Sequence, residues 1–170
     1  MKTRTLVTTG IMLAIALVFQ LGFAQFAQTL VGPLVNMTLI LTTVLVGIPA
    51  GIIVGCCTPI AAFALGIMPL LPVLPVVAAG NALLVILFGL VHHHLKQNWT
   101  DIPAVIAGAL AKFALMALAI RFIVPIFVPK VPVKLIQTFS LPQLVTALIG
   151  GALAIIILRF LPKTITARTK

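Results

Sequence analysis

Three polar residues stand inside otherwise apolar stretches of this chain: Asn36, Asn81 and Lys112. The segment from Gly32 to Leu90 contains no charged residue, so both amides are surrounded by apolar sequence. A buried amide forms hydrogen bonds to a neighbouring helix or to a bound molecule. Asn36 and Asn81 are therefore candidates for clamping an amide or hydroxyl group of a ligand, with helix-to-helix hydrogen bonding as the alternative.

Lys112 carries the sharpest chemical signal. A charged residue at the centre of a membrane segment is costly and is usually functional. The only acidic residue of the chain, Asp101, lies eleven residues before it, about 16 Å along a helix and too far for an ion pair. Either Lys112 is neutral or a ligand supplies its anion; the alternatives to ligand contact are hydrogen bonding to backbone carbonyls and a break in the helix. Arg121 lies about half a turn out of phase with Lys112 and is expected to reach toward the membrane surface instead.

Further polar residues lie near the expected segment ends. Gln20 and Gln28 are candidates for a ligand pocket or its lid, with an interfacial position as the alternative. Lys130 and Lys134 follow a proline-rich segment and are expected on one side of an extended strand. There they would attract an anionic solute or simply be solvated.

The composition places all these residues in a membrane protein. Of 170 residues, 62% are hydrophobic and 7% are charged, whereas soluble domains carry about 25% charged residues. The net charge of +10 comes mainly from the chain ends and short loops, which favours lipid headgroups over nucleic acid as its partner. The first apolar run is long and lacks a cleavage signal, so a retained span is favoured over a signal peptide.

Glycine and proline divide the apolar sequence into pieces of membrane-crossing size. We expect an all-α, polytopic membrane protein, in which one domain over residues 1–170 forms a bundle of six helices with short loops. Gly10 and Ala14, four residues apart on the first span, form a small-residue face that allows close helix contact. The expected spans cover residues 5–23, 34–47, 51–66, 76–95, 102–127 and 141–161.

Basic residues predict the orientation of this bundle. With six spans both termini share one side, and seven Lys and Arg residues fall on that side against Lys130 and Lys134 on the other. Both termini are therefore expected in the cytoplasm. Asn36, Asn81 and Gln20 then lie in the outer half of the membrane and Lys112 near its middle. This asymmetry predicts an outward-facing pocket above a sealed floor.

The residues needed for catalysis are scarce. One acidic residue cannot provide a carboxylate pair, no Gly-rich phosphate loop is present, and no catalytic residue or cofactor is expected. The run His92 to His94 has no companion ligands at metal spacing and is interpreted as a cap at the membrane edge. Cys56 and Cys57 are expected to be buried thiols. No intramembrane carboxylate is available for ion coupling, so active transport would draw its energy from a partner protein.

The layout and several motifs resemble those of the substrate-binding subunits of energy-coupling-factor (ECF) vitamin transporters. The resemblance rests on the six short spans, the Gly10 and Ala14 face, and the run GPLVN…GIPAGIIVG…TPIAAFALGI…GNALLV. It implies a cell-membrane subunit that captures a vitamin from outside and works with a transmembrane coupling protein and two ATPase subunits. It also implies that Gly10 and Ala14 contact the coupling protein, and that the pocket lies in the outer half.

The expected substrate follows from charge. Lys112 and the basic outer loop favour a ligand with an anionic or amide-rich surface, such as pantothenate or a corrinoid like cobalamin. Two alternatives remain at this point: a self-contained small channel or facilitator that oligomerises through its glycine strips, and a structural assembly subunit with no ligand.

Overall fold

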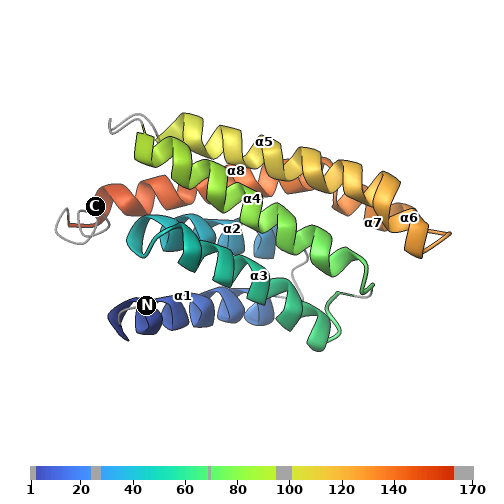
Figure 1. Ribbon diagram of the computed structural model, residues 1–170, viewed down its shortest axis with the longest axis horizontal. Coiled ribbons are helices and arrows are strands. Elements are labelled where there is room, and N and C mark those ends of the chain that lie inside the picture. The colour runs from blue at the N-terminus through green and yellow to red at the C-terminus, as the bar shows by residue number, and fades with distance from the viewer. Residues whose placement is uncertain (1–2, 24–27, 69, 95–100, 163–170) are drawn as a thin grey trace.

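The computed structural model describes residues 3–23, 28–68, 70–94 and 101–162. Within these ranges the chain is almost entirely helical and contains no strand, so the prediction of an all-α protein is confirmed. The long helices run side by side along one axis (Figure 1). In chain order the elements are α1 (Thr3–Gly22), α2 (Gln28–Leu45), α3 (Ile48–Ala64), α4 (Val73–His94), α5 (Asp101–Leu118), the π-helical turn η2 (Ala119–Ile123), α6 (Val124–Phe127), α7 (Val133–Thr138) and α8 (Leu141–Phe160).

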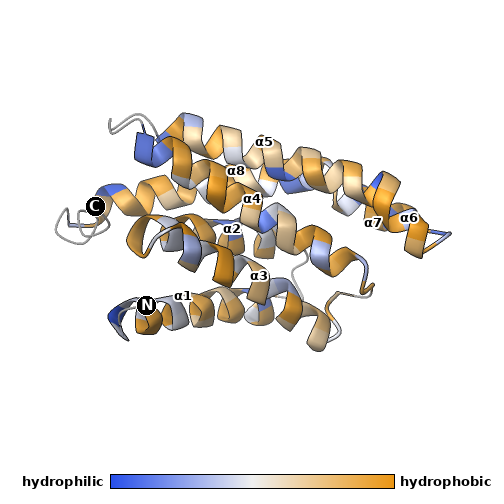
Figure 2. Ribbon diagram, viewed as in Figure 1, coloured by the Kyte–Doolittle hydropathy of each residue, from blue (hydrophilic) through white to orange (hydrophobic). Residues whose placement is uncertain are grey.

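The helices have the character of membrane spans. Four helical stretches are long and apolar enough to cross a bilayer: Thr3–Gly22, Val73–His94, Asp101–Phe127 and Val133–Phe160. Helices α2 and α3 are apolar but shorter. Hydrophobic colour covers most of every long helix in Figure 2, and a helix that is apolar on all sides belongs in lipid or deep in a core. The chain is therefore a helical membrane protein, and its number of crossings stays a prediction.

Helix α2 begins earlier than the sequence predicts. It starts at Gln28 rather than Leu34, so residues 28–33, which precede the expected span, are helical. Pro33 lies inside the helix, where its missing N–H costs one hydrogen bond near the helix start. At the other end, Gly47 has a φ of 123°, a backbone conformation that side-chain-bearing residues rarely adopt. This glycine turns the chain directly into α3 at Ile48.

The fifth predicted span contains a widened turn. In η2 the N–H of Val124 donates to the carbonyl of Ala119, five residues back. Such a turn before Pro125 accommodates a proline ring that would otherwise clash within a regular helix. Within this turn Ile120 is fully buried and Arg121 is exposed, so the two side chains point in different directions.

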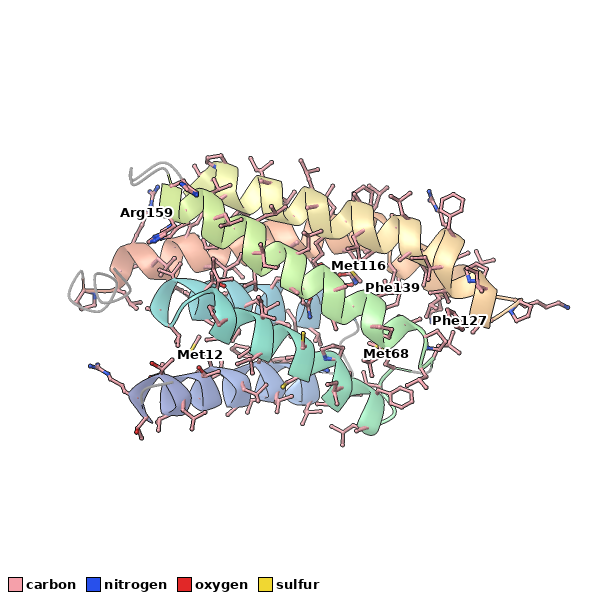
Figure 3. All side chains as sticks on the ribbon, in the orientation of Figure 1. Met12, Met68, Met116, Phe127, Phe139 and Arg159 are labelled. Atoms are coloured by element: carbon pink, nitrogen blue, oxygen red, sulfur yellow. The ribbon has the colours of Figure 1, made fainter. Side chains whose placement is uncertain are left out.

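The segment expected to be extended is partly helical. Residues Val133–Thr138 form α7, so the predicted strand is wrong for Lys134. Pro132 precedes the helix, and its carbonyl accepts the N–H of Leu135 at 2.8 Å, which starts the turn. After α7 the buried Phe139 packs in one apolar cluster with Met116, and both are labelled in Figure 3.

Two apolar clusters form the core. The larger one fills the half of the bundle where α4 and α8 end, and it includes Leu39, Leu84 and Phe88. The smaller one, around Met116 and Phe139, lies near α6 and α7. Helix α1 lies at the edge of the bundle and packs mainly against α2 and α3 (Figure 1). The polar residues described next lie between the two clusters.

Candidate functional site

Three of the predicted site residues meet in one hydrogen-bonded group, which we call the floor: Asn36, Asn81 and Lys112. The Nζ atom of Lys112 donates to Asn36 Oδ1 at 2.7 Å and to Asn81 Oδ1 at 2.8 Å. The three side chains come from α2, α4 and α5, and each is at most 3% exposed. Residues 76 positions apart in the sequence thus share one buried ammonium group.

Two glycines make room for the amides of the floor. A Cβ atom at Gly55 of α3 would lie 3.0 Å from Asn81 Cβ, and one at Gly150 of α8 would lie 2.8 Å from Asn36 Cβ. Both distances are shorter than ordinary van der Waals contact, so a larger residue would push the helices apart. The glycines of α3 and α8 therefore set how closely the floor is packed.

A proline fixes the orientation of Asn81. Pro59 has no N–H, so it cannot donate to the carbonyl of Gly55 four residues earlier in α3. Asn81 Nδ2 donates to this carbonyl at 2.8 Å, and Thr58 Oγ1 donates to it at 3.3 Å. Because the nitrogen of Asn81 is held by α3, its oxygen faces Lys112.

A cavity of about 510 Å³ opens above the floor. Its lining draws on α1, α2, α3, α4, α5, α7 and α8. The polar and charged residues that line it are Gln20, Asn36, Thr58, Asn81, Lys112, Lys134, Thr138 and Gln143, and the rest are mainly aliphatic. Such an apolar cavity with a few convergent polar groups is typical of a small-molecule site.

Gln20 closes one side of this cavity. Its Nε2 donates to the carbonyl of Thr58 at 2.9 Å, which ties the end of α1 to α3. Gln20 is 7% exposed, so the predicted pocket residue lies on the cavity and also has a structural bond. Gln28 begins α2, but its side chain lies outside the described part of the structure.

Gln143 is a cavity residue that sequence reasoning missed. It is 3% exposed, and its side chain makes no hydrogen bond to any residue that the structure describes. The only sequence signal was its place just inside the last apolar segment, after Pro142. Near it Thr138 donates its hydroxyl to the carbonyl of Lys134 at 2.8 Å, and the exposed Lys134 lies at the cavity rim.

Of the described residues, two lysine side chains line the cavity, and no acidic side chain does. Asp101, the sole acidic residue of the sequence, lies at the other end of α5. There its Oδ1 is 2.6 Å from Nδ1 of His92, whose ring stacks on Phe88 with centroids 5.5 Å apart. The ammonium of Lys112 therefore has amide oxygens as its partners and no carboxylate.

The histidines and cysteines that the sequence draws attention to do not line the cavity. Among the described residues, no group of His, Cys and Asp side chains is arranged to hold a metal ion. His92 instead pairs with Asp101 at the helix end. Cys56 and Cys57 are free and half-buried on α3, so the prediction of buried thiols is met only in part.

Gly10 and Ala14 lie together on the exposed side of α1. A Cβ atom at Gly10 would meet no atom of the described residues within 4 Å, so no described residue packs closely on this glycine. Leu6, Ile11 and Val18 on the same helix are also more than half exposed. The small-residue face is thus open rather than covered by α2 or α3.

Comparison with known proteins gives one family. The model of the family described as "ECF transporter, substrate-specific component" matches residues 4–161. The comparison with curated proteins and the comparison with solved structures each returned no match.

Proposed function

Because the chain belongs to the family of substrate-specific components of ECF transporters, we propose that it captures a vitamin-sized micronutrient in the cavity above Lys112. The captured molecule is then delivered to the cytoplasm by a transmembrane coupling protein and two ATPase subunits. The observation that carries this proposal is the cavity of about 510 Å³ with a buried cationic floor.

The size of the cavity favours one of the two substrates that charge suggests. Its volume of about 510 Å³ lies within the range of roughly 300 to 1,000 Å³ that is typical of sites for small organic molecules. Pantothenate is in this size range. A corrinoid such as cobalamin has several times as many atoms as pantothenate and would extend beyond the cavity. We therefore propose pantothenate, or an acid of similar size, as the substrate.

The position of the cavity supports capture from outside. Helix α1 begins and α8 ends at the same end of the bundle, and α6 and α7 lie at the other (Figure 1). Arg4 and Arg159 lie at the first end, and four further basic residues precede Arg4 or follow Arg159 in the sequence. Under the positive-inside rule this end is cytoplasmic, so six crossings would leave the cavity open toward the exterior.

The open face of α1 supports the proposal that a partner protein binds the chain. Gly10 and Ala14 leave a shallow, apolar strip on a helix at the edge of the bundle. Small residues allow another membrane helix to approach closely. We propose this strip as the contact for the coupling protein.

The apolar core beneath the floor favours capture over an independent channel. Leu39, Leu84 and Phe88 are fully buried there, in the half of the bundle opposite α6 and α7. The purified chain should therefore bind one micronutrient molecule per monomer and allow no solute flux in liposomes. Native mass spectrometry of gently extracted protein and a flux assay test this directly. Flux without tight binding would contradict the proposal and favour the channel.

A further inference from the structure

We propose that the floor binds the carboxylate of a small organic acid, and that the other end of the same molecule is bound near Gln143. This inference rests on the proposed function, because it names the chemical class and the orientation of the molecule that the subunit captures. It depends on which hydrogen-bonding atoms the floor leaves free.

The floor offers donors to a ligand. Asn81 directs its nitrogen at Gly55 and its oxygen at Lys112, so both ends of its amide are engaged. Asn36 also directs its oxygen at Lys112. Its Nδ2 has no acceptor among the described residues and is not sealed from the cavity. An ammonium group has three N–H bonds, of which Lys112 uses two here. The free groups are N–H donors, and a ligand must bring the acceptors.

The positive charge of Lys112 favours a carboxylate over the other acceptor groups that a ligand could bring. A buried ammonium without an anion carries a large desolvation cost. The cavity has no acidic residue, since Asp101 is paired with His92 elsewhere. Hydrogen bonds between ionised partners are about twice as strong as neutral ones. A ligand carboxylate thus compensates Lys112 in a way that a neutral amide or hydroxyl does not.

The opposite end of the cavity is suited to a neutral polar group. Gly150 packs on Asn36, and Gln143 precedes Gly150 by seven residues, about 10 Å along α8. Gln143 has both a donor and an acceptor available. Lys134 is exposed at this rim, so water weakens its attraction for a second anion. These features describe a monocarboxylate with a hydroxyl or amide group about 10 Å from the acid.

The test compares the charge class of captured molecules in three versions of the whole chain. Wild type, Lys112→Met and Lys130→Met are purified in nanodiscs and incubated with a deproteinised extract of bacterial cells grown in rich medium. Bound molecules are identified by native mass spectrometry, and their affinity is measured by titration. Lys130→Met is the matched control, because it removes the same charge from an exposed position that does not line the cavity.

We expect the wild type and Lys130→Met to capture a monocarboxylic acid, and Lys112→Met to bind it about 100-fold more weakly. Asn36→Asp is a second variant in case Lys112→Met does not fold; it keeps the oxygen that Lys112 contacts and adds an internal anion, so it should also lose the acid. Capture of a neutral or cationic molecule with unchanged affinity in these variants would overturn the inference and the choice of an acid as substrate, and would leave the proposed role in micronutrient capture standing. A wild type that captures nothing would overturn both.

Discussion

The substitution Asn36→Asp tests the floor with the smallest change in shape. Asn36 Oδ1 already accepts from Lys112 Nζ at 2.7 Å, and its Nδ2 has no acceptor in the described part of the chain. The aspartate retains the oxygen beside Lys112 and replaces the free donor with a second oxygen. The variant thus carries its own counter-ion at the position where we expect a ligand carboxylate to bind.

The expected loss follows from the geometry around one ammonium group. Two acceptors at about 2.7 Å from a tetrahedral nitrogen lie about 4.4 Å apart. Two negative charges at that separation repel by about 3 to 4 kcal/mol at an effective dielectric constant of about 20. This energy corresponds to a loss of roughly 150- to 900-fold in affinity for an acid. A neutral analogue meets no such repulsion and should lose less than about 5-fold.

The assay is calorimetric titration in nanodiscs with an acid and its primary alcohol, pantothenate and pantothenol being the first pair. Wild type should prefer the acid, and Asn36→Asp should lose or reverse this preference. The control Gln143→Glu places a carboxylate about 10 Å farther out on α8. It should reduce the affinity for the acid by a smaller factor. Equal selectivity of wild type and Asn36→Asp would refute our account of the floor.

Three further predictions concern the helices around the floor. In Pro59→Ala the restored N–H competes with Asn81 for the carbonyl of Gly55, so affinity for the acid should fall about 3- to 10-fold in titrations; an unchanged affinity would contradict the orienting role of Pro59. Gly150→Ala would bring Cβ to 2.5 Å from the carbonyl of Pro33 and should destabilise the bundle by about 1 to 3 kcal/mol in denaturation, whereas Gly10→Ala should not destabilise it. Gly10→Trp should block co-purification with the coupling protein and leave solute binding unchanged; a retained complex would exclude this face as the contact.

Much of the architecture was predictable because lipid imposes simple rules on sequence. Long uncharged runs require helices, and the positions of Gly47 and the prolines mark many of the breaks. The predictions failed at prolines that were expected to exclude helix and that the helices accommodate instead. Pro33 lies inside α2 at the cost of one helix hydrogen bond, and Pro132 directly precedes α7 rather than preventing it.

Most residues of the candidate site could be predicted from the sequence, but the hydrogen bonds between them could not. Asn36, Asn81 and Lys112 stood out because buried polar groups in lipid are rare and costly. Asn81 is oriented by the carbonyl of Gly55, which accepts no helix hydrogen bond from Pro59. This contact depends on how α3 and α4 pack, and the spacing of residues in the sequence does not determine that packing. Gln143 was missed because its burial depends on how α8 packs against the other helices, which the sequence near Gln143 does not indicate.

The most direct measurement of the central claim is an experimental structure of the chain in a nanodisc with its captured solute bound. Our account predicts a carboxylate oxygen of the solute within hydrogen-bonding distance of Lys112 Nζ, and a hydroxyl or amide of the same molecule beside Gln143. A solute whose acid group lies at the α7 end, or one that leaves the floor without contact, would contradict it.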